Sequence, residues 1–267
     1  MHAKFNLNPG DETWENYLGI GQCFHDRNKN IVQEDLDKFK DIDNTLQAQE
    51  IINNWFPSVK ADVFLSHSHK DEKLIIGLAG WLRENFGIRS FIDSAVWGYS
   101  DDLLKLIDDG FCKNKSNEYY DYSKRNRSTS HVHMMLSTAL ADMIDRCECV
   151  IFVNTPNAFN PEKYLKNEGK TESPWIYSEI AMTRMIRERT PEEHRLKPAM
   201  DAFASSQSYI NEADKRELKI YYDTDLLHLT PLSCNDLMAW KNEERGSMRE
   251  ACALDSLYKM KRKQYGE

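Results

Sequence analysis

A tryptophan and a glutamate four residues apart, Trp175 and Glu179, are the pair of side chains best placed for chemistry. They follow Ser173 and Pro174, and a serine followed by proline is typical of the start of a helix. Because residues i and i+4 share one helix face, both side chains should point toward the same surface. There the indole could stack on a planar ring beside the carboxylate. The alternative is an amphipathic helix with a core tryptophan and a solvated glutamate.

Polar residues also follow a short apolar run, DVFLS at 62–66, that suits a buried strand. Those that could contact a sugar or a phosphate are Ser66, His67, Ser68 and Lys70. A helix N-terminus directly after them would favour an anion. Ser68 also precedes an acid by three residues, as in a capping box, so helix capping alone is an equal explanation of this loop.

A second apolar run ends at Asp93, and Trp97 lies in the polar segment that follows it. Asp93 could orient that loop or bind a sugar hydroxyl, and turn formation or helix capping is at least as good an explanation. Trp97 could close over a ligand ring. It could equally pack into a neighbouring subunit, because exposed aromatic side chains favour interfaces.

The elements that must hold these residues alternate between strand and helix. Apolar runs predict strands at 62–66, 88–92 and 149–153. Helical spacing predicts helices at 70–86, 101–111, 131–146 and 173–189, with Gly87 as a C-cap. This alternation predicts an α/β fold with a doubly wound parallel sheet, in which ligands bind beyond the carboxyl ends of the strands.

The two ends of the chain carry weaker signals. Residues 1–60 are polar, with one helical pattern at 32–55 that Pro57 ends, so we expect a helical N-terminal extension packed on the main domain. We expect short strands at 220–222 and 227–229 and a terminal helix at 249–263. The predicted division is an extension at 1–60, a central domain at 61–232 with an insertion near 112–130, and a helical C-terminal extension at 233–267.

Composition excludes several classes of function. The 267 residues carry a formal net charge of −8, which argues against a nucleic-acid binder that relies on bulk positive charge. No run approaches the roughly 18 apolar residues of a membrane helix, and no signal peptide is evident. Without a signal for secretion, the six scattered cysteines indicate reduced thiols in a cytoplasmic protein. Their spacing is not that of a zinc site. Phosphate-loop and GxSxG motifs, which would indicate ATP or serine-ester hydrolysis, are missing from the sequence.

Four segments resemble TIR (Toll/interleukin-1 receptor) domains in the order of that family. They are DVFLSHSHKDE at 62–72, FID at 91–93, VIFVNTPNAF at 150–159 and SPWIYSE at 173–179. The resemblance covers roughly 62–189 and implies a flavodoxin-like TIR fold for the central domain, similar to stand-alone bacterial antiviral (Thoeris-like) proteins. The insertion at 112–131 and a long loop at 154–172 depart from the family pattern and could reshape a ligand pocket.

Catalytic TIR domains cleave the bond between nicotinamide and ribose in NAD, so the resemblance implies NAD as substrate, with no separate cofactor or metal. It implies that Glu179 is the catalytic carboxylate, which would stabilise oxocarbenium character at the ribose. It assigns substrate binding to Trp175, Asp93, Ser66, His67, Ser68, Lys70 and Trp97. It also implies ADP-ribose or a cyclic isomer as product, a role in antiphage defence, self-association, and an effector that senses the product.

The sequence is also compatible with other functions. A TIR domain could act as a non-enzymatic scaffold that signals by assembly. A phosphoacceptor receiver shares the doubly wound layout, but it needs an acidic pair after the first strand, where this chain has Ser-His-Ser-His. The insertion interleaves lysines, arginines and tyrosines, and could bind a dinucleotide pyrophosphate or single-stranded nucleic acid. A charged, solvated loop is the alternative for that segment.

Overall fold

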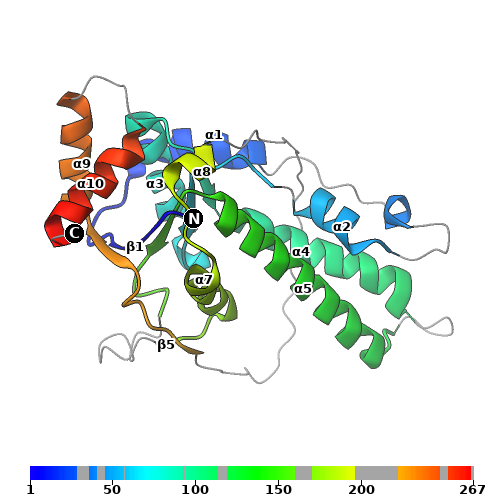
Figure 1. The fold of residues 1–267 in the computed structure, drawn as a ribbon. Coiled ribbons are helices and arrows are strands. Elements are labelled where there is room, and N and C mark those ends of the chain that lie inside the picture. Colours follow the sequence, from blue (N-terminus) through cyan, green and yellow to red (C-terminus); the bar gives the residue numbers. More distant parts are fainter. Residues whose placement is uncertain are drawn as a thin grey trace.

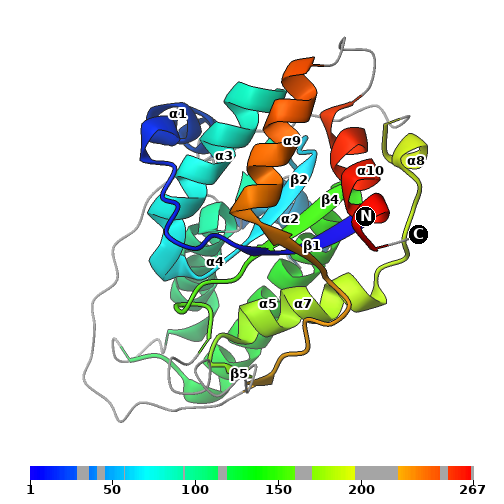
Figure 2. The same cartoon turned by 90° about the vertical axis from the view of Figure 1, so that its left-hand side faces the viewer.

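A central sheet of five parallel strands, in the order β3-β2-β4-β1-β7, forms the middle layer of the protein. Helices cover both of its faces (Figures 1 and 2). This computed structural model describes residues 1–28, 36–40, 46–56, 58–92, 94–113, 119–159, 170–195, 222–246 and 252–265. The predicted α/β class and parallel sheet are confirmed.

The strands lie close to the predicted positions where apolar runs mark them. The sheet contains β1 (Ala3–Asn8), β2 (Val63–Ser66), β3 (Ser90–Ile92), β4 (Cys149–Val153) and β7 (Thr230–Ser233). A separate antiparallel pair joins β5 (Lys170–Thr171) to β6 (Tyr222–Asp223). The strand predicted at 227–229 is wrong by a few residues, because a turn closed by a 2.9 Å hydrogen bond from Leu229 N–H to Leu226 O precedes β7.

The N-terminal strand β1 is the largest departure from expectation. We predicted a helical extension for residues 1–60, but Ala3–Asn8 lies between β4 and β7 in the sheet. Phe5 and Leu7 are buried on one face while Lys4 and Asn6 point to the other, which is the two-residue period of a strand. The first strand of the sheet therefore comes from a segment that sequence reasoning placed outside the domain.

The rest of the predicted extension is also less helical than expected. A single helix at 32–55 is wrong, because the described part holds a short 3-10 helix (Leu36–Phe39) and α2 (Ala48–Trp55). A β-bridge between Lys40 and Leu46 separates the two. Residues 29–35, 41–45 and Pro57 lie outside the described residues. Ile51 and Trp55 of α2 pack into the core.

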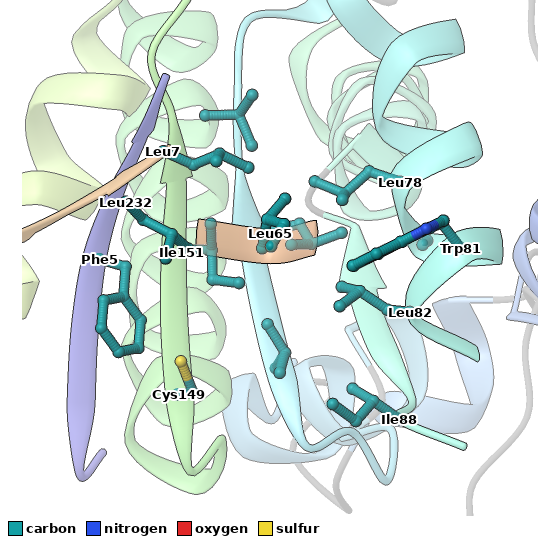
Figure 3. Close-up of a cluster of buried hydrophobic side chains, with 14 of the residues drawn as sticks. Phe5, Leu7, Leu65, Leu78, Trp81, Leu82, Ile88, Cys149, Ile151 and Leu232 are labelled. Atoms are coloured by element: carbon teal, nitrogen blue, oxygen red, sulfur yellow. The ribbon is translucent and has the colours of Figure 1, made fainter. Parts of the chain in front are cut away.

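Four helices lie on one side of the sheet. These are α1 (Leu18–Asn28), α3 (Glu72–Phe86), α9 (Cys234–Gly246) and α10 (Ala253–Tyr265). Figure 3 shows side chains of α3 against those of β1, β2 and β4, among them Leu65, Leu82 and Ile151. Helices α1 and α3 approach so closely that a Cβ on Gly21 would lie 1.9 Å from Ile76 O. Gly87 ends α3 with a φ of 70°, as the sequence predicted.

The other face packs against α2, α4 (Ser94–Ile107), α5 (Tyr122–Arg146) and α7 (Pro174–Met185). Helix α4 begins seven residues before the predicted start at 101, so the expected loop after β3 is helical. A π-helix (Asp108–Cys112) follows it. Helix α5 begins nine residues before the predicted start at 131, because Asp121 caps it by accepting a 3.0 Å hydrogen bond from Lys124 N–H. Much of the predicted insertion is therefore helix.

Three further elements are short. They are 3-10 helices at Glu15–Tyr17 and His69–Asp71 and the helix α8 (Pro191–Arg195). The predicted terminal helix begins at Ala253, later than expected, and its residues Leu254, Leu257 and Tyr258 are buried in the hydrophobic cluster that α3 forms with the sheet. Among the helices of the described segments, none has the length and apolar character needed to cross a bilayer.

Candidate functional site

The carboxyl ends of β2 and β4 mark the topological switch point of the sheet. The two strands are neighbours, but the chain leaves β2 for α3 on one face, and the next long helix after β4, α7, lies on the other. In doubly wound sheets this divergence opens the crevice where ligands bind. The end of β2 and the segments after β2 and β4 carry most of the predicted site residues, whereas Asp93 and Trp97 follow β3.

Glu179 of α7 reaches the end of β2. Ser173 caps this helix, accepting a 3.3 Å hydrogen bond from Ile176 N–H, and Pro174 occupies its first turn as predicted. Ser66, the last residue of β2, donates from Oγ to Glu179 Oε2 at 2.6 Å. The exposed fractions of Ser66 and Glu179 are 2% and 1%. The fold therefore joins two predicted site residues in one buried hydrogen bond.

Trp175 makes a different contact from the one the sequence suggested. Its ring packs edge-on against His133 of α5, with 5.6 Å between ring centroids, and it borders the hydrophobic cluster between the sheet and helices α2, α4 and α5. The indole is partly buried there, and its stacking on a ligand ring stays a prediction. Glu179, however, is not the solvated glutamate of the alternative interpretation. The two side chains of α7 therefore contact different elements, the indole against α5 and the carboxylate against β2.

The loop after β2 is buried at its start and exposed at its end. His67 is 2% exposed, and its Nδ1 lies 3.3 Å from Leu65 O, where it donates to that carbonyl. Ser68 is also buried, but its side chain makes no capping hydrogen bond, so the capping box of the alternative is not formed. Lys70 is exposed. His67 and Ser68 therefore lie beside Ser66, whereas Lys70 points away from this buried group.

Two further predicted residues can be placed only in part. Asp93 lies outside the described residues. Trp97 belongs to helix α4, but its side chain lies outside the described part of the structure. Their predicted contacts with a ligand stay predictions.

Sequence reasoning missed Asp71 as a residue that joins the two loops of the switch point. Its carboxylate accepts hydrogen bonds from Thr155 Oγ1 and, at 2.6 Å, from Asn157 Nδ2. Both partners follow β4, while Asp71 precedes α3. The acid in SHSHKDE and the polar residues of the TPN run are both visible in the sequence. Their hydrogen bonds, however, depend on β2 and β4 being neighbours in the sheet, and the sequence does not show that pairing. Asp71 thus ties the loop after β2 to the loop after β4.

Replacing Asp71 with alanine should lower the free energy of unfolding by about 2 kcal/mol, because it leaves the buried Thr155 hydroxyl and the Asn157 amide without their acceptor. Denaturant unfolding at neutral pH measures this. Asp142→Ala is the matched control, since it removes only a half-exposed pair with Arg146 and should cost well under 1 kcal/mol. Equal losses in the two variants would show that Asp71 does not hold the loops.

Two basic side chains of the predicted insertion, Lys113 and Arg125, pair with acids of the π-helix at Asp108–Cys112. Lys113 lies 2.8 Å from Asp109, and Arg125 lies 2.9 Å from the buried Asp108. Hydrogen bonds from Lys113 and from Tyr120, which donates at 2.6 Å, lower the pKa of Asp109, and the bond to Asp109 raises the pKa of the Tyr120 phenol. These contacts favour the charged, solvated alternative over a nucleotide site for this segment.

Two clefts are lined by described residues, and neither is lined by a predicted site residue. One, of about 520 Å³, lies at the amino ends of β2, β3 and β4, and the other, of about 650 Å³, lies beside the amino end of β1. Within the described segments, no group of three or more His, Cys, Asp or Glu side chains is arranged to hold a metal ion. No family model, curated protein or solved structure matches the chain.

Proposed function

We propose that this chain is a TIR-like enzyme that cleaves the bond between nicotinamide and ribose in NAD. The observation that carries the proposal is the buried pair of Ser66 and Glu179 at the carboxyl end of β2. A doubly wound sheet binds its ligands at this position. The TIR-like order of sequence segments assigns the same glutamate to catalysis, so pattern and position agree on one carboxylate.

Cleavage of the nicotinamide–ribose bond requires little more than one well-placed carboxylate. Nicotinamide is already cationic in NAD and departs as a neutral molecule, so its departure needs no proton. Positive charge then develops at the ribose. A carboxylate in a water-poor site stabilises that charge more strongly than it would in bulk water. Ser66, which donates to Oε2, would hold the carboxylate in one orientation toward the sugar.

Substrate binding has a structural requirement. Because only 1% of Glu179 is exposed, NAD must displace the groups that cover it before its ribose can meet the carboxylate. We therefore expect binding of NAD to be coupled to a local opening at the switch point. Such opening steps commonly control turnover in enzymes.

The resemblance also guides the proposed biology. Capture of the ribose carbon by water would give ADP-ribose, and capture by another part of the same molecule would give a cyclic isomer. Either could serve as a signal to an effector in antiphage defence. The six free cysteines fit a reducing cytoplasm. Activity would require self-association of the chain.

A direct assay tests the proposal. The full chain, at several protein concentrations, is incubated with NAD, and the products are separated by liquid chromatography. We expect nicotinamide to appear together with ADP-ribose or a cyclic isomer, and the specific activity to fall on dilution. Folded protein that leaves NAD intact at the highest concentration would contradict the enzymatic proposal.

The burial of Glu179 also favours a second candidate, a non-enzymatic scaffold that signals by assembly. In that case the Ser66–Glu179 bond serves only to satisfy a buried acid. Light scattering separates the two functions when it accompanies the NAD assay. A chain that assembles without consuming NAD is the scaffold.

A further inference from the structure

The cleft beside the amino end of β1 is a separate feature from the switch point. Its volume is about 650 Å³, and its walls come from β1, the segment before β7, the chain after α7, and α10. Figure 2 shows α10 running beside the start of β1. The Glu179 site is at the carboxyl ends of β2 and β4, whereas this cleft is at the amino end of β1 and the sheet edge.

Positive charge dominates the walls of this cleft. The charged lining groups are Lys4, Lys261, Arg262 and Glu188. Three cations against one carboxylate stand out in a chain whose net charge is −8. A pocket lined by one sign of charge concentrates ligands of the other sign.

The cations are held in place rather than left to move freely. Lys4 Nζ lies 2.8 Å from Glu188 and donates to Thr183 O at 3.2 Å, so two of its three ammonium hydrogens have partners and one remains for a ligand. Lys261 is 4% exposed and lies 3.1 Å from Asp236, which accepts two further hydrogen bonds from Ser233. Both ammonium groups are thereby preorganised.

Glu188 and Asp236 neutralise the two lysines, whereas neither of them pairs with Arg262. It is exposed, lines the cleft, and forms no ion pair within the described residues. It lies four residues after Tyr258 on α10, so both project from one helix face. A guanidinium that forms no ion pair, beside two fixed ammonium groups, suits the bidentate recognition of a phosphate.

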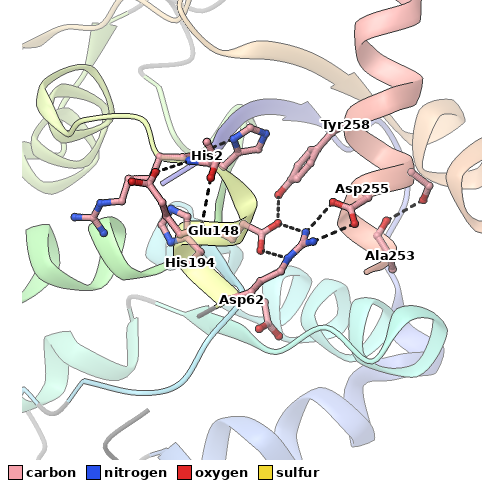
Figure 4. Close-up of polar contacts among 12 residues, drawn as sticks. His2, Asp62, Glu148, His194, Ala253, Asp255 and Tyr258 are labelled. Carbon is pink, nitrogen blue, oxygen red and sulfur yellow. Dashed lines mark hydrogen bonds and ion pairs between the residues drawn. The ribbon is translucent and has the colours of Figure 1, made fainter. Parts of the chain in front are cut away.

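The walls also offer flat and apolar surfaces. Tyr258 packs edge-on against His2, with 4.8 Å between ring centroids, and Phe5 stacks at 6.4 Å behind it (Figure 4 shows His2 and Tyr258). Leu229 and Pro231 also line the cleft. Ligand pockets in proteins usually have volumes of about 300–1,000 Å³ and combine such surfaces with a few fixed polar groups. The volume of this cleft falls within that range.

We propose that this cleft binds a small phosphate ester of nucleotide size. Arg262 and Lys4 receive the phosphate, Lys261 adds positive charge to the cleft wall, and the organic part packs toward Tyr258 and Leu229. The site lies outside the proposed NAD-cleaving centre and does not depend on it.

Calorimetric titration of the full chain with AMP tests this site, with inorganic phosphate and adenosine as comparison ligands. We expect saturable binding of AMP that weakens with added salt, weaker binding of phosphate, and none of adenosine. Arg262→Gln should weaken AMP binding about tenfold, because it removes a charge-assisted contact. Lys263→Gln, the matched control, removes an exposed charge from the neighbouring position without touching the cleft, and should leave the affinity unchanged.

Two results would overturn the proposal. One is the lack of saturable binding by AMP or phosphate at millimolar concentration. The other is an equal effect of Arg262→Gln and Lys263→Gln, which would indicate only a general charge effect. Glu179→Gln should leave AMP binding intact, and its loss in that variant would place the ligand at the switch point instead. Failure of the NAD assay therefore leaves this site testable by itself.

Discussion

Glu179→Gln should abolish most NAD cleavage, with a loss of rate of about 100- to 1,000-fold, equivalent to about 3–4 kcal/mol of transition-state stabilisation. Glutamine keeps the size of the side chain and an oxygen that can accept the hydrogen bond from Ser66. It removes only the negative charge that would face the developing cation on the ribose. Initial rates of nicotinamide release from saturating NAD measure the change.

The stability of the same variant separates catalysis from structure. Exchanging a buried carboxylate for a neutral amide removes a desolvation cost, so the unfolding temperature of Glu179→Gln should stay the same or rise. Lower activity with unimpaired stability would therefore indicate a functional charge. Glu84→Gln on the exposed side of α3 is the control and should change neither property. If the two variants cleave NAD equally well, Glu179 is not the catalytic group.

The parts of the fold that sequence could predict are those with local signals. The run CVIFV gives a buried strand, β4, with the predicted bounds, and Gly87 ends α3 at the predicted residue. Strand β1 carries an equally regular alternation in KFNLN, but it is short and flanked by polar residues. Its place between β4 and β7 is decided by pairing with residues more than 140 positions away. Local patterns do not contain that information.

The candidate site was predictable in its parts and not in its contacts. Ser66 and Glu179 were both identified by residue type and by position, Ser66 at the end of a predicted strand and Glu179 four residues after Trp175 in a predicted helix. Their shared hydrogen bond depends on which face α7 covers, and so does the contact of Trp175 with α5. Asp71 was overlooked because its partners follow a different strand. Each of these outcomes follows from strand order.

A second group of long-range contacts ties the C-terminal helix to the sheet. Arg195 donates to both oxygens of Glu148, from Nη2 at 2.7 Å and from Nε at 3.0 Å, and it also pairs with Asp255 of α10 at 2.8 Å (Figure 4 shows the two acids). Tyr258 donates to Glu148 at 3.1 Å. The Glu148 side chain is 7% exposed, so its charge depends on these partners rather than on water.

Arg195→Met should therefore lower the free energy of unfolding by about 3 kcal/mol, because it leaves the Glu148 carboxylate buried without its cation. We take the lower end of the usual range since the Arg195 side chain is 34% exposed. Arg187→Met is the control, because it removes a largely exposed pair with Glu193 and should cost less than about 1 kcal/mol. Denaturant unfolding at pH 7 gives both values.

The acid limb of the stability curve gives this prediction a second readout. Hydrogen bonds from Arg195 lower the pKa of Asp255 in the folded state. Asp255 therefore stabilises the fold above its unfolded pKa of about 4, and that contribution is lost as the pH falls through its lower folded value. Arg195→Met should flatten this loss below pH 4. A single unfolding transition in both proteins would also show that α10 unfolds with the sheet. A separate early transition in the wild type would instead make residues 233–267 an independent extension, in which case Arg195 cannot stabilise the sheet through Asp255.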